Sequence, residues 1–137
     1  MFSIDLIQWP KSANSAIHFY LGFLVWVLDA LKINFSAYEN DPICTTKLFL
    51  DGVVSNDERL QESKLWWDYI DSREAMRDFQ DKEILMARLA ICLLSFTEKD
   101  VEYLGENLSW FLEVLGFLGE NVDKAIEMME VYFEPKS

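Results

Sequence analysis

The chain has 137 residues, the length of one ordinary globular domain, and 51% of them are hydrophobic, which is enough to bury a core. Its 24 acidic and 12 basic residues give a formal net charge of -12, which counts against binding nucleic acid or an anionic membrane, because both are polyanions. We therefore expect one folded domain over residues 1–137, with a cationic protein, or no charged molecule at all, as its partner.

The first expected helix begins at an N-cap, Ser12 or Asn14, and runs to about Ile33. It is apolar nearly all round, which places it in the middle of a helical bundle. Its uninterrupted apolar core, residues 19–28, is about half the roughly 20 residues that a bilayer requires. The preceding residues carry Asp5 and a single lysine and offer no cleavage site, unlike a signal peptide. A soluble protein that is not exported is expected.

Residues 34–56 are expected to form a long irregular connection, because they contain a proline, a glycine and several turn formers. Within this connection, residues 45–54 fit either a short helix or a strand followed by a turn, and their periodicity does not distinguish the two.

The second expected helix is capped by Ser55 or Asn56 and has acidic residues at the positive end of its dipole. Its pattern continues past Ser72 towards Phe79. The third covers residues 81–96 and is the second central helix, and its only interior charge is an arginine that either reaches the surface or is paired.

The fourth expected helix has Thr97 as its N-cap, runs to about Leu118 and is closed by Gly119. The fifth is capped by Asn121 and ends before Pro135. Short links join antiparallel neighbours, except after the first helix. The expected fold is an all-α, single-domain bundle of about five helices.

Helical projection places carboxylates on one side of the second, fourth and fifth helices, beside aromatic residues. In the second helix, Trp66 and Ile70 point inward and an aspartate strip points outward. Like charges one turn apart repel by a few tenths of a kcal/mol per pair, so a surface selected only for stability would mix the signs. A solvated outer face explains the stripes equally well. The candidate partner-binding residues are Trp67, Asp68, Tyr69, Asp71, Glu98, Glu102, Tyr103, Glu106, Trp110, Glu113, Asp123, Glu127 and Glu130.

Residues suited to catalysis are sparse. The single histidine, His18, lies in the most apolar helix and is expected to be a core or cap-region residue. Cys44 is expected in a loop and Cys92 in the core, and the absence of a CxxC pair predicts a reducing cytoplasm. No catalytic triad, zinc-ligand spacing or phosphate-binding glycine loop is present, so we expect no enzyme, cofactor or metal site.

A small, acidic, all-helical chain with aromatics beside carboxylates and no catalytic set resembles the immunity proteins of bacterial toxin systems, those of contact-dependent growth inhibition and of nuclease bacteriocins. The stretch WWDYID is loosely similar to the aromatic and acidic helices of the colicin nuclease inhibitors, with a different spacing. The resemblance implies a cytoplasmic immunity protein that binds a cationic nuclease toxin domain, expected to be an RNase. Its acidic stripes would steer association, with Trp67, Tyr69, Tyr103 and Trp110 as anchors.

Three other functions remain open. A nucleic-acid mimic that blocks a DNA-binding protein would array its carboxylates at phosphate-like spacing over a long surface. An Mg²⁺-dependent all-α nucleotide pyrophosphohydrolase would pair Glu127-x-x-Glu130 with Asp68-x-x-Asp71 on facing helices. An acidic secretion chaperone would bind an effector. The sequence determines neither the oligomeric state nor which stripe contacts a partner.

Overall fold

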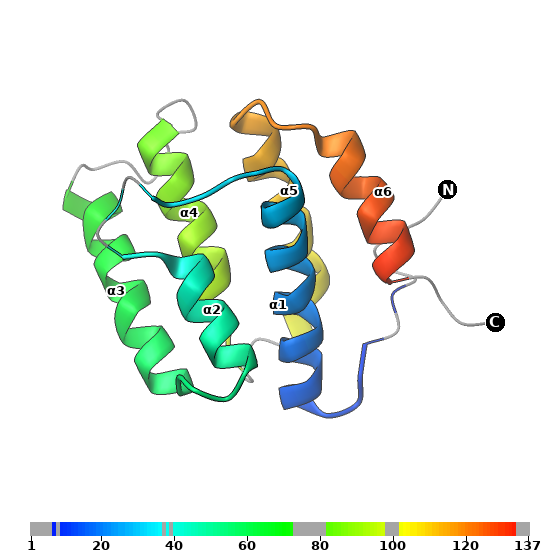
Figure 1. Ribbon diagram of the computed structural model, residues 1–137, viewed down its shortest axis with the longest axis horizontal. Helices are drawn as coiled ribbons and strands as arrows, with labels where there is room; N and C mark the ends of the chain where they lie inside the picture. Colours follow the sequence, from blue (N-terminus) through cyan, green and yellow to red (C-terminus); the bar gives the residue numbers. More distant parts are fainter. Residues whose placement is uncertain are drawn as a thin grey trace.

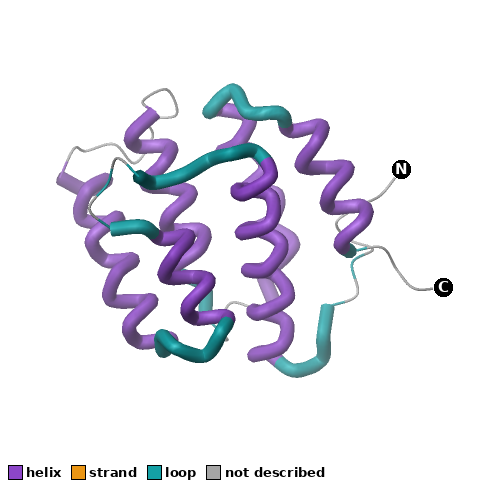
Figure 2. Tube along the Cα trace, viewed as in Figure 1, coloured by secondary structure: helices purple, strands orange, loops and turns teal. Residues whose placement is uncertain are grey.

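The computed structural model describes residues 7, 9–36, 38, 40–72, 82–97 and 102–133. These ranges contain six α-helices and no strand, which confirms the all-helical class with one helix more than expected (Figures 1 and 2). The helices are α1 (Ala13–Ala30), α2 (Pro42–Leu50), α3 (Asn56–Ser72), α4 (Lys82–Leu94), α5 (Leu104–Phe117) and α6 (Val122–Tyr132).

Successive helices run in alternating directions, so that neighbours in the chain are antiparallel (Figure 1). Helix α3 lies at one edge and packs on α2 and α4, whereas α6 lies at the opposite edge and packs on α1 and α5. Helix α4 also packs on α2 and α5. This arrangement separates α3 from α6 by the width of the structure.

Most of the core comes from the two helices expected to be central. Helix α1 buries nine of its 18 residues and α4 buries eight of its 13. By length and composition alone, α1 is also the one helix among the described residues that could cross a membrane. Half of it is buried inside the protein, and a core helix of a soluble protein passes the same test.

Helix α2 occupies the middle of the expected irregular connection. Its N-cap is Asp41, whose carboxylate accepts hydrogen bonds from the backbone amides of Ile43 at 2.9 Å and Cys44 at 3.2 Å. Pro42 occupies the first turn, where its missing N–H and fixed φ are tolerated. The expectation that Cys44 lies in a loop was wrong, because this cap starts the helix three residues before the stretch 45–54.

Local capping signals located three other helix ends correctly. The Ser55 hydroxyl accepts from the backbone amide of Glu58 at 3.1 Å, which caps the start of α3, and donates to the Glu58 carboxylate at 3.3 Å. Ser12 caps α1, and the Asn121 side chain accepts from the backbone amide of Lys124 at 3.0 Å to cap α6. The expected continuation of α3 over residues 73–79 lies outside the described residues.

Helix α5 begins later than expected. Its α-helical turns start at Leu104, whereas the sequence placed the N-cap at Thr97; residues 102–103 form a 3₁₀ turn, and residues 98–101 lie outside the described ranges. Tyr103, the observed N-cap residue, makes no side-chain capping bond. Leu104 is the first buried residue of α5, and packing of its apolar side stabilises the helix. Its end is as expected, with Gly119 at a φ of 78°.

Candidate functional site

The expected contact residues fall on two separate surfaces. The α3 surface comprises Asp57, Glu58, Lys64, Leu65, Trp67, Asp68 and Asp71, all of which are exposed. The α5–α6 surface comprises Glu102, Tyr103, Glu106, Glu113, Phe117, Asp123, Lys124, Glu127 and Glu130, which are exposed as well. Because α3 and α6 lie at opposite edges, no single partner face contains all the expected residues (Figure 1). Glu98 lies outside the described residues.

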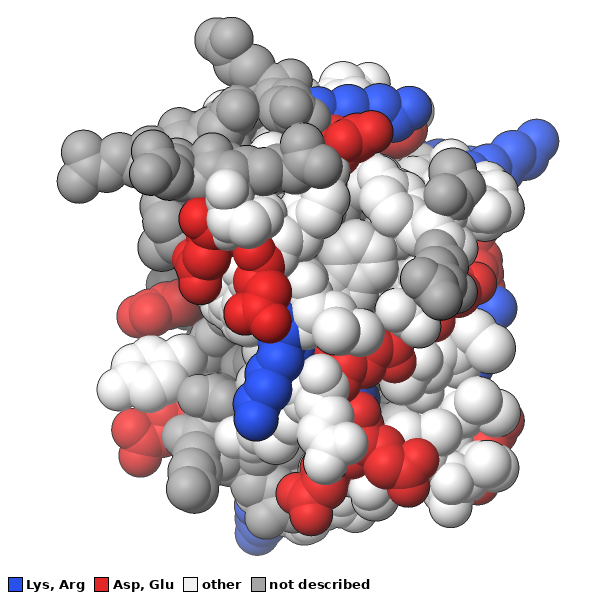
Figure 3. Space-filling view, turned by 90° about the vertical axis from the view of Figure 1, so that its left-hand side faces the viewer, with Lys and Arg blue, Asp and Glu red and all other residues white. Residues whose placement is uncertain are grey.

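On the α3 surface, the two adjacent tryptophans have different environments. The Trp66 side chain is 6% exposed and contacts the rings of Phe35 and Tyr38, with centroids 5.7 Å and 5.4 Å away. Ile70 is fully buried, so the expectation that both residues point inward is confirmed. Trp67 is 37% exposed and faces solvent among acidic side chains, which are interspersed with basic ones on this side of the molecule (Figure 3).

Tyr69 contacts the protein itself. Its hydroxyl donates a 2.7 Å hydrogen bond to the carboxylate of Glu83 at the start of α4, and the ring is half-buried. This bond ties α3 to α4 and uses the polar group that a partner would bind. Tyr69 is therefore a weaker anchor for a partner than the sequence indicated.

Arg59 is a buried cation on α3 that the sequence pattern did not single out. Its guanidinium donates to the backbone carbonyls of Leu93, at 2.8 Å, and of Phe96, near the C-terminal end of α4. It also lies 4.5 Å from the ring centroid of Phe49 and donates to Asn56 at 3.2 Å. Burial lowers the pKa of Arg59 to about 10, so it stays charged at neutral pH. Cations are favoured at a helix C-terminus, where they complement the dipole.

One acid of α3 faces α2 as well as solvent. Glu62 is half-buried, and burial raises the pKa of its carboxyl group. The hydroxyl of Thr45 lowers this pKa and the carboxylate of Asp41 raises it. The carboxylate is therefore partly held inside the helix packing and contributes less to the solvent-facing charge.

The α5–α6 surface contains six carboxylates and one cation, Lys124. None of these carboxylates forms an ion pair within the described residues. The one salt bridge found there joins Lys47 on α2 to Asp29 on α1, at 3.1 Å. Tyr103 and Phe117 are each 50% exposed beside these acids. This surface therefore joins unneutralised negative charge to accessible aromatic area.

Two aromatic residues of α5 differ from the sequence-based expectation. Trp110 is half-buried, and the guanidinium of Arg88 on α4 lies 5.8 Å from its ring centroid, within cation–π distance. Trp110 therefore helps to join α5 to α4. Phe117 is more exposed than Trp110 but was not selected from the sequence. Phe117 lies seven residues after Trp110, which places the two on the same side of the helix.

The residues with catalytic potential are engaged in structure. The Nδ1 atom of His18 lies 2.8 Å from the carbonyl of Asn14, and its ring stacks on Phe49 with centroids 4.9 Å apart. Burial raises the pKa of the Cys92 thiol to about 12, which keeps it protonated and unreactive at neutral pH. The described residues contain no group of three or more histidine, cysteine or acidic side chains placed to hold a metal ion.

The two carboxylate pairs considered for Mg²⁺ do not face each other. Asp68 and Asp71 lie on α3 and Glu127 and Glu130 on α6, at opposite edges of the structure. A shared ion requires ligands within about 2.0–2.1 Å of the metal, which this separation prevents.

Comparison of the chain with protein-family models, curated proteins and solved structures gives no match.

Proposed function

We propose that this chain is a single-domain helical bundle that acts in the cytoplasm as an immunity protein, binding a cationic nuclease toxin domain and blocking its substrate-binding cleft. The observation that carries this proposal is the α5–α6 surface, where six exposed carboxylates accompany one lysine and two half-exposed aromatic rings. The expected RNase activity of the toxin rests on the resemblance to immunity proteins alone.

Charge and aromatic area have distinct roles in such a complex. A nuclease binds a polyanion through a basic cleft, so an acidic inhibitor is attracted to the same cleft and associates faster at low salt. Aromatic side chains buried at the centre of the interface slow dissociation. Tyr103 and Phe117 are the candidate anchors, since they lie on the acidic surface with half of their area accessible.

The α5–α6 surface is favoured over the α3 surface for three reasons. Tyr69 on α3 is bonded to Glu83, and Glu62 is drawn towards α2. The α3 surface sets four acids against Lys64, whereas the α5–α6 surface sets six against Lys124, so the α3 surface has the weaker negative potential. The α3 surface is therefore a secondary contact region in this proposal, with Trp67 as its exposed aromatic residue.

The alternatives have less support from the geometry. A mimic of nucleic acid requires one long array of carboxylates, whereas the acids lie on two edges separated by α1, α2 and α4. The Mg²⁺ enzyme requires facing acid pairs, and its two pairs occupy those same opposite edges. A chaperone role has no separate observation in its favour.

A pair of matched charge variants tests the proposal. One variant neutralises three acids of the α5–α6 surface, Glu106→Gln, Glu113→Gln and Glu127→Gln; the other neutralises three on α3, Asp57→Asn, Asp68→Asn and Asp71→Asn. Both remove three charges from exposed positions. Binding to a panel of purified basic RNase toxin domains is measured by biolayer interferometry at several salt concentrations. The panel includes any such domain that is encoded beside this gene.

We expect the wild type to inhibit at least one toxin domain, with an association rate that falls as salt rises. The α5–α6 variant should associate about tenfold more slowly at low salt, and the α3 variant about twofold or less, because local charge complementarity sets the rate. If none of the toxin domains forms a complex with the protein, the proposed immunity function is overturned. A larger loss in the α3 variant would overturn the choice of surface.

A further inference from the structure

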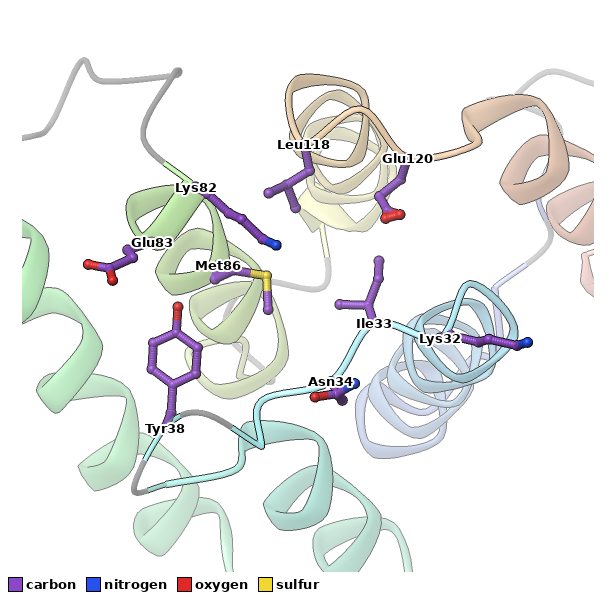
Figure 4. Close-up of a pocket in the computed structure, with 9 residues that line it drawn as sticks. All are labelled: Lys32, Ile33, Asn34, Tyr38, Lys82, Glu83, Met86, Leu118 and Glu120. Carbon is purple, nitrogen blue, oxygen red and sulfur yellow. The ribbon is translucent and has the colours of Figure 1, made fainter.

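A pocket of about 430 Å³ lies at the end of the structure where α1 and α5 finish and α4 begins (Figure 4). Its volume falls in the range of roughly 300–1,000 Å³ that is usual for small-molecule sites. Three segments distant in sequence form it: the connection after α1, the first turns of α4 and the link between α5 and α6. The pocket adjoins the end of the α5–α6 surface, because Leu118 and Glu120 lie between Phe117 and Asp123 in the chain.

The pocket combines an apolar lining with two opposite charges that point into it, Lys82 and Glu120, whereas a second lysine of the lining, Lys32, points away (Figure 4). Ile33, Met86 and Leu118 supply the apolar part, and the Met86 sulfur lies towards the open space (Figure 4). The Lys82 amine points into the same space from α4, and the Glu120 carboxylate points into it from the link after α5 (Figure 4). The apolar side chains and the two charged groups therefore face the same pocket.

Lys82 and Glu120 do not neutralise each other. No ion pair joins them, and neither forms an ion pair with another described residue. The one salt bridge among the described residues joins Lys47 and Asp29. The second acid on the rim, Glu83, accepts the hydroxyl of Tyr69 at 2.7 Å. An unpaired cation and an unpaired anion thus line the same pocket, although the chain as a whole is strongly acidic with a net charge of -12.

We propose that this pocket binds a small zwitterion with an apolar side group, the chemistry of an apolar α-amino acid or a short apolar peptide. The ligand's carboxylate lies against the Lys82 amine, its ammonium group against the Glu120 carboxylate, and its apolar group over Met86 and Leu118. Each charge of the ligand meets its opposite, and the apolar group leaves water, so the pairing and the burial act together.

Ligands with a single charge fit this pocket less well. A monoanion would leave Glu120 without a partner and would be repelled by it. A monocation would leave Lys82 without a partner and would be repelled by it. The apolar lining disfavours a fully polar ligand, because it offers few hydrogen bonds in return for lost hydration. The proposal does not depend on toxin binding, because none of these residues belongs to the α5–α6 surface.

Titrations followed by the methyl NMR signals of Met86 and Leu118 test the proposal. The probes are leucine, the dipeptide leucylleucine, and two singly charged analogues of leucine, isopentylamine and 4-methylpentanoate. Leucine and leucylleucine differ in the separation of their ammonium and carboxylate groups, so their relative affinities distinguish a free amino acid from a short peptide. The variants are Lys82→Gln and Glu120→Gln, with the exposed Lys64→Gln and Glu113→Gln as charge-matched controls.

We expect saturable shifts at both methyl groups with at least one zwitterion, and binding at least tenfold weaker for each analogue, corresponding to one missing charged contact. Lys82→Gln and Glu120→Gln should each weaken binding about tenfold, and the two controls should leave it unchanged. Absence of saturation with both zwitterions would overturn the proposal, as would equal binding of the singly charged analogues. Binding that persists in both pocket variants would place the ligand elsewhere and would overturn it too.

The outcome for the pocket is distinguishable from the outcome for the proposed function. Lys82→Gln is expected to bind a toxin domain as the wild type does, because Lys82 lies on α4 and the α5–α6 surface is unchanged. Circular dichroism spectra of the four variants verify that each is folded.

Discussion

Helix α3 and the α5–α6 surface have a similar composition, with carboxylates beside aromatic residues, yet their environments differ. Helix α3 directs Trp66 and Arg59 into the core and bonds Tyr69 to α4. The α5–α6 surface leaves its acids without ion pairs in the described residues and holds Tyr103 and Phe117 half exposed. An acidic and aromatic stripe is therefore available to a partner only where its side chains stay exposed.

The largest expected effect tests this difference at two adjacent residues of α3. Trp66→Ala removes a ring that is 6% exposed and should lower the free energy of unfolding by about 3–5 kcal/mol, because it leaves a cavity. Trp67→Ala removes one that is 37% exposed and should cost less than about 1 kcal/mol. Urea unfolding followed by circular dichroism measures both. Equal losses would mean that the division of α3 into a core side and a solvent side is wrong.

Arg59 tests the inward role of charge on α3. Arg59→Met should lower the free energy of unfolding by about 2–4 kcal/mol, because the carbonyls of Leu93 and Phe96 lose a charged donor inside the protein. The control Lys64→Met removes an equal charge from an exposed position of the same helix and should stay within about 0.5 kcal/mol. If both substitutions have the same effect in urea unfolding, Arg59 does not stabilise the end of α4.

The smallest expected effect compares one acid from each region. The pKa of Glu62 is raised, so the folded protein binds a proton at this residue more tightly than the unfolded chain does. Glu62 therefore lowers the stability as pH rises from its pKa in the unfolded chain to its pKa in the folded protein. Glu62→Gln should raise the free energy of unfolding at neutral pH by about 0.5 kcal/mol or less. This gain should begin to fall as pH drops below the pKa of Glu62 in the folded protein, and it should be absent below the pKa of Glu62 in the unfolded chain.

Glu106→Gln is the matched control for Glu62→Gln, since Glu106 is exposed on the α5–α6 surface and makes no ion pair among the described residues. We expect Glu106→Gln to leave the free energy of unfolding unchanged, because its side chain is exposed. Thermal unfolding from acidic to neutral pH measures both variants. A gain for Glu106→Gln equal to that for Glu62→Gln would show that general charge repulsion, and not the contact of Glu62 with α2, is responsible.

Sequence patterns located most helices but not all their limits. The Ser55 and Asn121 caps and the Gly119 stop were found because each depends on a hydrogen bond or a backbone conformation within a few residues. A short helix within residues 45–54 was one of two alternatives, but the start of α2 was missed although Asp41-Pro42 is a start signal of the same kind, because the proline was counted as a sign of a loop.

The candidate surface was predictable only in part. Exposure of Glu106 and Glu113 followed from their position opposite the apolar side of α5. The roles of Tyr69 and Trp110 did not, because each depends on a residue of α4, Glu83 in one case and Arg88 in the other. Helical projection places a residue on a side of its own helix but does not show which helix packs against that side.

The sequence by itself determined the all-helical class, several helix ends and the excess of negative charge, since these follow from local hydrogen bonding, apolar periodicity and composition. Only the tertiary structure decided that α3 and α6 lie at opposite edges, that Arg59 points inward, and that Lys82 and Glu120 meet at one pocket. Those features depend on contacts between residues far apart in the chain, where close packing selects which polar groups are buried, paired or left exposed.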